Sequence, residues 1–150
     1  MNFKFTRYAG NPILKPNANN QWENLCVLNP AVVFDDKTNK FVMIYRAGGD
    51  EIKHNIRLGL AVSDDGYNFV RQSDEPIFDV DENDADGGCV EDPRVVNIDG
   101  IYYMTYASRA YAPGRYWLEP YVEGVTKAPR YLDETDFFCD GLPSFANDNI

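Results

Sequence analysis

This chain has little of what metal sites, disulfide frameworks and membrane spans require. Its 150 residues include one histidine and three cysteines, with no Cys-x-x-Cys pair. A zinc site or a disulfide framework is therefore not expected, and the thiols should be reduced. No apolar run approaches the roughly 20 residues of a membrane-spanning helix. The first residues also lack the apolar core of a signal peptide, so a cytoplasmic location is expected.

Positive charge is scarce as well. The chain has 24 acidic and 14 basic residues, which gives a net charge of −10. Such a surface repels phosphate backbones and anionic lipids, so neither nucleic acid nor a membrane is an expected partner. The length corresponds to about one domain.

Short apolar runs separated by turn residues follow a polar, irregular arm over residues 1–24. A β-hairpin is predicted from the runs 31–34 and 41–45, because a cluster of turn-forming residues lies between them. A third run at 56–62 and a short fourth strand at 67–70 would complete a four-stranded antiparallel sheet within residues 25–75. The sequence therefore predicts an all-β fold.

The pattern restarts in the second half of the chain. Residues 29–33 match residues 92–96 at an offset of 92 − 29 = 63, and residues 43–45 match 104–106 at an offset of 104 − 43 = 61. The second unit is two residues shorter, and the difference falls in its turn at 99–100. Because the length changes by an even number of residues, each side chain stays on the same face of its strand. Chance similarity is the alternative, but a sheet-sized unit repeated at about 60 residues favours a β-propeller.

The second predicted blade covers residues 90–150, and together with the first it forms one propeller domain over 25–150. A propeller needs at least four blades, so the domain is expected to continue beyond this chain. Sheet edges left unpaired in such a fragment favour association, which makes a homo-oligomer one expected state.

The residues most suited to chemistry lie at 87–94, Gly-Gly-Cys-Val-Glu-Asp-Pro-Arg. Pro93 is expected to hold Asp92 in an extended conformation at the mouth of a strand. Arg94 adds a permanent cation and is a candidate substrate-binding residue. The alternative is a turn that leads into a strand and whose charges face water.

A stretch rich in aromatic and arginine residues follows at 108–121. Aromatic rings beside hydrogen-bonding cations suit the apolar face and the hydroxyls of a sugar, so Tyr111 is a candidate substrate-binding residue. The alternative is an insertion packed for its own stability. The acidic run 79–84 lacks the glycine and the final glutamate of a calcium loop, so no metal is expected there.

Four segments together resemble glycoside hydrolase family 130, the family of β-mannoside phosphorylases and related β-mannosidases. They are residues 28–33 (Leu-Asn-Pro-Ala-Val-Val), 44–47 (Ile-Tyr-Arg-Ala), 57–66 and 90–96 (Val-Glu-Asp-Pro-Arg-Val-Val). The resemblance runs from about residue 7 to residue 109. It implies a five-bladed β-propeller of four-stranded antiparallel blades, of which this chain holds about the first two, with the sugar bound at the central mouth.

The resemblance also implies roles for four residues. Asp92 corresponds to the proton donor, Asn29 and Arg46 to residues that hold the mannose, and Arg109 is the nearest match to an arginine of the phosphate site. The implied reaction is inverting phosphorolysis of mannosyl-glucose or β-1,4-manno-oligosaccharides to α-mannose 1-phosphate. Inorganic phosphate is the co-substrate, and no cofactor is implied.

Two other functions stay open from the sequence. A β-mannosidase or another propeller hydrolase would need a second carboxylate as base. Glu91 is expected to have a structural role instead, because adjacent residues on a strand point to opposite faces. A non-catalytic glycan-binding propeller is the remaining possibility.

Overall fold

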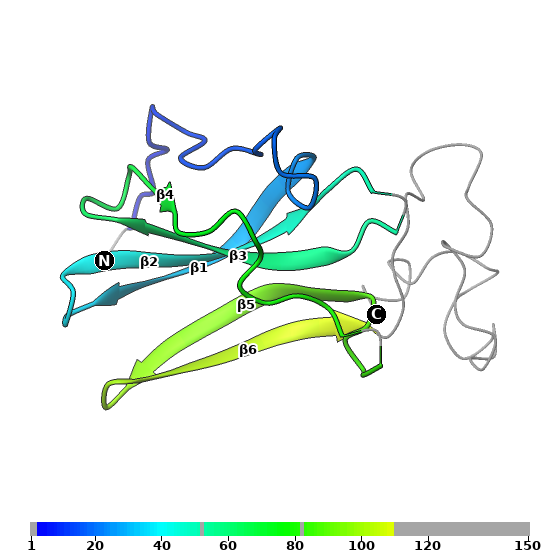
Figure 1. The fold of residues 1–150 in the computed structure, drawn as a ribbon. Helices are drawn as coiled ribbons and strands as arrows, with labels where there is room; N and C mark the ends of the chain where they lie inside the picture. Colours follow the sequence, from blue (N-terminus) through cyan, green and yellow to red (C-terminus); the bar gives the residue numbers. More distant parts are fainter. Residues whose placement is uncertain (1–2, 52, 82, 110–150) are drawn as a thin grey trace.

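The computed structural model describes residues 3–51, 53–81 and 83–109, and the regular structure in these ranges is all β (Figure 1). The strands are β1 (Cys26–Asp35), β2 (Lys40–Gly48), β3 (Ile56–Ser63), β4 (Val70–Arg71), β5 (Cys89–Ile98) and β6 (Ile101–Arg109). Strands β1 to β4 form one antiparallel unit, and the β5–β6 hairpin belongs to a second. A parallel pairing of Ile56 with Cys89 joins the two units. The described part of the chain contains no helix that could cross a membrane.

The predicted repeat is confirmed by the registers of the two hairpins. Their end pairs are equivalent: Cys26–Gly48 and Asp35–Lys40 in the first, Cys89–Arg109 and Ile98–Ile101 in the second. The offset is therefore 63 along the first strand and 61 along the second, as in the sequence. The shorter second turn has positive φ at both Asp99 (52°) and Gly100 (82°), which is the geometry of a tight two-residue hairpin turn.

A β-bulge interrupts the first strand of each unit at the same place. The register shifts between Leu28 and Ala31 in β1 and between Glu91 and Arg94 in β5. Inside these bulges Asn29 has φ 44° and Asp92 has φ 53°. Asparagine and aspartate adopt this left-handed conformation more readily than most other residues that carry a side chain.

The prediction that Pro93 holds Asp92 in an extended conformation is therefore wrong. A proline disfavours right-handed helical backbone at the preceding residue, but it does not prevent the left-handed conformation that the bulge requires. The consequence is a change in the direction of the Asp92 side chain relative to a regular strand.

The predicted fourth strand is shorter and later than expected. Strand β4 consists of Val70 and Arg71, which pair with β3. The residues before it form a turn that is held by side-chain hydrogen bonds. Asp65 Oδ1 accepts hydrogen bonds from three groups in this turn: the Ser63 hydroxyl and the backbone amides of Tyr67 and Asn68. These hydrogen bonds, with one from the Asn68 side chain, hold the pKa of Asp65 well below its usual range.

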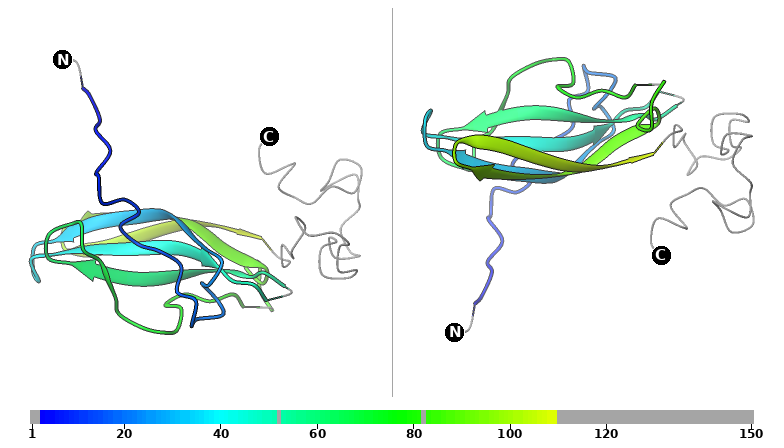
Figure 2. Two further views of the ribbon diagram at one scale, coloured as in Figure 1. Left: turned by 90° about the horizontal axis from the view of Figure 1, so that it is seen from above. Right: turned by 90° about the horizontal axis from the view of Figure 1, so that it is seen from below.

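One hydrophobic cluster of the first unit lies on one face of its sheet. Its buried side chains are Met43, Tyr45, Ala47 and Ala61. Ile13, Leu14 and Trp22 from the N-terminal arm pack against this cluster, and the Trp22 ring stacks on Tyr45 at a centroid distance of 6.3 Å. Figure 2 shows the start of the arm extending away from the sheets before the chain crosses them.

A buried carboxylate fastens the arm to the first unit. Glu23 is fully buried, and Arg71 Nε donates to both of its oxygens at 2.8 and 2.9 Å. The Tyr45 hydroxyl donates to Glu23 at 3.1 Å, and Asn20 Nδ2 donates at 2.9 Å. Burial and the nearby Glu23 charge raise the pKa of Tyr45, so its hydroxyl keeps its proton and remains a donor.

Candidate active site

Three of the predicted site residues meet where the two units adjoin. Asn29 lies in the bulge of β1, Arg46 lies in β2, and Asp92 lies in the bulge of β5. Asn29 Nδ2 donates to Asp92 Oδ1 at 2.7 Å, and Arg46 Nη1 donates to the same oxygen at 3.0 Å. The fold thus brings together residues that are far apart in the sequence.

The repeat explains why these side chains converge. Asn29 and Asp92 are equivalent positions of neighbouring units, and each is the bulge residue with positive φ. A bulge re-aims the side chain of its extra residue, and the two bulges here direct an amide and a carboxylate toward each other. Arg46 joins them because it pairs with Leu28, the last residue of β1 before the bulge.

Arg46 lies between two adjacent carboxylates. Its Nη1 contacts Asp92 at 3.0 Å, and its Nη2 contacts Glu91 Oε2 at 2.6 Å. The expectation that Glu91 and Asp92 point to opposite faces is therefore wrong here, because the bulge breaks the alternation of the strand. Charge-assisted contacts to both Nη groups fix the orientation of a planar guanidinium.

Glu91 extends this cluster to the last residue of β6. Its Oε1 lies 3.4 Å from Arg109 Nη2 and accepts a hydrogen bond from the Cys89 thiol at 3.4 Å. Glu91 is buried, with 8% of its surface exposed. Burial, together with the Glu91 charge, raises the pKa of Cys89 to about 12, so the thiol stays protonated and serves as a donor.

The neighbours of Asp92 hold it as a carboxylate. Partial burial pushes its pKa up, but hydrogen bonds from Asn29 and Arg46 and the positive charges of Arg46 and Arg94 outweigh that effect and lower it. Both side-chain hydrogen bonds fall on Oδ1. Within the described ranges, Oδ2 accepts no side-chain hydrogen bond, and it is the oxygen on which a proton can be carried.

This low pKa gives a prediction for stability against pH. A carboxylate whose pKa is depressed by folding stabilises the folded state above its ordinary value of 3.8, and that contribution is lost as the pH falls through the folded-state pKa. We expect the unfolding free energy of wild type to exceed that of Asp92→Asn by more at pH 6 than at pH 3. Urea unfolding of both proteins at the two pH values measures the difference, and an equal difference at both would contradict the assigned pKa.

The remaining predicted site residues are Arg94, Arg109 and Tyr111, and the structure describes the first two of them. Arg94 is exposed, and its Nη1 donates to the carbonyl oxygens of Asp92 at 3.1 Å and Pro93 at 2.8 Å. It therefore folds back on the bulge beside the predicted proton donor. Arg109 reaches the cluster through Glu91. Tyr111 lies outside the described residues.

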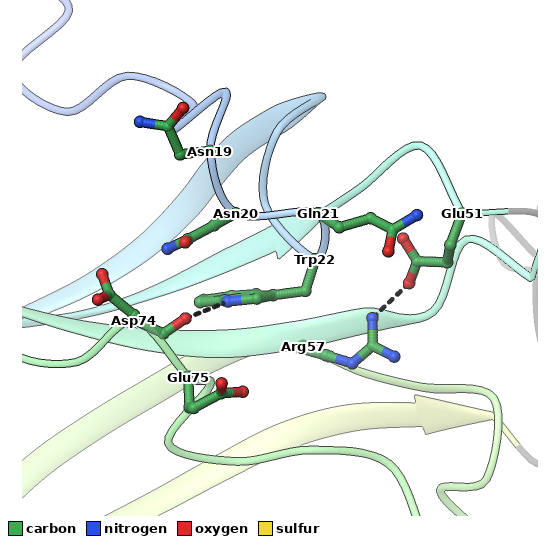
Figure 3. A pocket seen from close by; sticks show the side chains of 8 residues that line it. All are labelled: Asn19, Asn20, Gln21, Trp22, Glu51, Arg57, Asp74 and Glu75. Atoms are coloured by element: carbon green, nitrogen blue, oxygen red, sulfur yellow. Dashed lines mark hydrogen bonds and ion pairs between the residues drawn. The ribbon is translucent and has the colours of Figure 1, made fainter.

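A separate pocket of about 380 Å³ lies between the arm and the first unit (Figure 3). Its lining residues are Asn19, Asn20, Gln21, Trp22, Glu51, Arg57, Asp74 and Glu75. Trp22 Nε1 donates to the Asp74 carbonyl at 2.8 Å, and Arg57 pairs with Glu51 and with Asp79. None of the residues predicted for catalysis or substrate binding lines it.

Comparison with known proteins agrees with the motif resemblance and with the all-β fold. The sequence profile of glycoside hydrolase family 130, described as β-1,4-mannooligosaccharide phosphorylase, matches residues 5–126. The chain belongs to glycoside hydrolase family 130. Its relatives include a 1,2-β-oligomannan phosphorylase of Thermoanaerobacter sp., 44% identical over 108 residues, which covers 69% of this chain and 35% of the relative.

A second relative and a solved structure extend the match. A β-1,2-mannobiose phosphorylase of Thermoanaerobacter sp. is 38% identical over 128 residues, which covers 78% of this chain and 40% of that protein. A structure from work on glycoside hydrolases of family 130 that target β-1,2-mannosidic linkages in Candida mannan matches with a TM-score of 0.60 and 34% identity. The match covers 71% of this chain and 34% of the solved chain. The chain thus spans little more than a third of the length of these relatives.

The structural match confirms the predicted all-β fold of propeller type. Within the described residues the strands are not closed into a ring. The sequence had not placed Glu91 in the site. The signal available was its position directly before Asp92, in a segment where an Asx-Pro pair recurs in both units.

Proposed function

We propose that this family 130 chain supplies two blades and part of the active site of a β-mannoside phosphorylase. The observation that carries the proposal is the cluster around Asp92, in which one half-exposed carboxylate lies against an amide and a fixed guanidinium. Two relatives at 44% and 38% identity are named as phosphorylases, which supports the same reaction. The division into blades over 25–75 and 90–150, and a cytoplasmic location, are parts of this proposal.

The geometry supports Asp92 as the proton donor. Asn29 and Arg46 occupy Oδ1, so the proton is carried on Oδ2 and passes to the leaving oxygen, directly or through a mannose hydroxyl. The glycosidic C–O bond breaks as a phosphate oxygen attacks the anomeric carbon from the opposite face and forms the new C–O bond. The products are α-mannose 1-phosphate and the shortened acceptor.

The charge of phosphate prepares Asp92 for this role. A carboxylate with a lowered pKa is a poor acid, but a nearby anion disfavours its ionised form and raises the pKa. Phosphate bound among Arg109 and its neighbours would act on Asp92 in this direction. The acid would then be protonated in the complex that reacts rather than in the free protein.

Among the described residues, the carboxylate next to Asp92 is not placed to activate water. An inverting hydrolase needs a second carboxylate that activates water. Glu91 is the carboxylate next to Asp92, but it is buried and contacts Arg46, Arg109 and the Cys89 thiol. It is therefore unsuited to act as a base, whereas phosphate arrives ionised and needs cations to position it.

We infer a β-1,2-linked manno-oligosaccharide as the first substrate to test. Two relatives carry this linkage in their names. The motif resemblance implied mannosyl-glucose or β-1,4-manno-oligosaccharides, and the family description names the β-1,4 linkage. The two linkages present different acceptor hydroxyls, so a comparison of initial rates separates them.

The first test measures phosphate dependence in the full-length gene product. β-1,2-Mannobiose, β-1,4-mannobiose and mannosyl-glucose are each incubated with and without inorganic phosphate, and mannose 1-phosphate and free mannose are quantified. We expect mannose 1-phosphate from at least one of them, only when phosphate is present. Free mannose formed at the same rate without phosphate would replace the proposal with hydrolysis, and no turnover of all three would overturn it.

A further inference from the structure

Glu91 joins the two functional halves of the cluster around Asp92. One of its oxygens contacts Arg46 Nη2 at 2.6 Å, and the other lies 3.4 Å from Arg109 Nη2. Arg46 in turn contacts Asp92 at 3.0 Å. A continuous series of charged groups therefore runs from Asp92 through Arg46 and Glu91 to Arg109.

The burial of these groups separates the roles of the two carboxylates. The Asp92 side chain is 35% exposed, whereas that of Glu91 is 10% exposed. Substrate can therefore approach Asp92 more easily than Glu91. The chemical contribution open to Glu91 is to hold the two arginines.

Another glutamate–arginine pair lies apart from the cluster around Asp92. Glu51 pairs with Arg57, whose Nε also contacts Asp79. The side chains of this pair are 21% and 16% exposed. Among the described residues, neither has a hydrogen bond or an ion pair with Asn29, Arg46 or Asp92. Glu51 thus offers a matched control for the loss of a partly buried carboxylate.

We propose that Glu91 is a positioning residue that orients Arg46 toward Asp92 and Arg109 toward the phosphate co-substrate. This inference rests on the phosphorylase function proposed above. An arginine side chain has many rotamers. Each arginine whose rotamer is fixed before substrate binds reduces the conformational entropy that is lost when the complex forms. Glu91 fixes two arginines, Arg46 and Arg109, with a single carboxylate, because each of its oxygens contacts a different guanidinium.

The inference predicts a kinetic effect that a general loss of stability would not produce. Glu91→Gln keeps the size of the side chain but removes its negative charge and replaces one acceptor oxygen with an NH2 donor, so both arginines lose an ionic partner and one of them also loses its acceptor. Loss of an outer-shell partner that orients metal ligands costs about 10–100-fold in affinity or activity, and we take the lower end of that range for an outer-shell partner of two arginines. We expect the KM for phosphate to rise about tenfold and kcat to fall about tenfold, in line with that range.

The experiment uses the full-length protein with Glu91→Gln, Glu91→Asp and Glu51→Gln. Initial rates are measured over a matrix of phosphate and mannobiose concentrations, and melting temperatures are recorded for each variant. Support requires a larger phosphate KM in Glu91→Gln than in Glu51→Gln, with partial recovery in Glu91→Asp, which retains the carboxylate. Equal phosphate KM values in Glu91→Gln and wild type, or equal changes in the Glu51 control, would overturn the inference.

A direct binding measurement separates this inference from the proposed function. If wild type shows no phosphorolysis, the proposed function fails, and calorimetric titration with inorganic phosphate then tests Glu91 alone. A tenfold weaker phosphate affinity in Glu91→Gln but not in Glu51→Gln supports the positioning role. The same affinity in wild type and Glu91→Gln overturns it.

Discussion

Replacement of Asp92 with asparagine should lower kcat by roughly 10²–10⁴-fold, the range expected for loss of a general acid. Asparagine keeps an oxygen that accepts from Asn29 and Arg46, so the cluster should retain its shape. It has no acidic proton to give to the leaving oxygen. The rate of mannose 1-phosphate release, measured with β-1,2-mannobiose and saturating phosphate, tests this directly in the full-length protein.

A change of leaving group makes the Asp92 test specific for proton donation. An aryl β-mannoside with a good leaving group needs less protonation than a disaccharide. The loss caused by Asp92→Asn should therefore be smaller with the aryl substrate. Asp79→Asn is the control, because Asp79 contacts Arg57 outside the cluster. Less than a tenfold loss with both substrates would remove Asp92 from the role of acid.

Replacement of Glu23 with alanine should lower the free energy of unfolding by about 3 kcal/mol, the lower end of the cost of breaking a buried ion pair. The variant leaves Arg71 without its carboxylate partner and removes the acceptor of the Tyr45 hydroxyl. The N-terminal arm would then lose one of its attachments to the first unit and would keep the packing of Ile13, Leu14 and Trp22. Urea unfolding of the full-length protein measures the effect.

Glu75 provides the control for the Glu23 prediction. It is an exposed glutamate at the rim of the pocket beside the same arm, so Glu75→Ala should change the unfolding free energy by no more than about 0.5 kcal/mol. A Glu23→Ala variant as stable as the Glu75→Ala variant would show that the buried cluster does not fasten the arm.

The strands and the repeat could be predicted because their signals are local. Apolar runs bounded by turn residues marked β1, β2 and β3, and the offsets of 63 and 61 fixed the equivalence of the hairpins. The fourth strand was misplaced because the hydrogen bonds of Asp65 favour a turn over an extended run. A pattern of apolar and polar residues gives little information on whether side-chain hydrogen bonds will favour a turn over a strand.

The site was only partly predictable for a different reason. Asn29, Arg46 and Asp92 were named from motif resemblance, and the structure places them in contact. The contribution of Glu91 depends on a bulge, which reverses the direction of one side chain without changing the apolar pattern. Glu23 was missed because its partner Arg71 lies 48 positions away, and nothing local to either residue predicts the pair.

The paired bulges also bear on how such a site can arise by duplication. Asn29 and Asp92 occupy one position in two copies of the same unit, with the same left-handed backbone. The two positions are in contact, with Asn29 Nδ2 at 2.7 Å from Asp92 Oδ1. An ancestral unit with one polar bulge residue would, once doubled, already hold a symmetric pair. A single exchange between asparagine and aspartate would then suffice to make one copy the acid and the other its support.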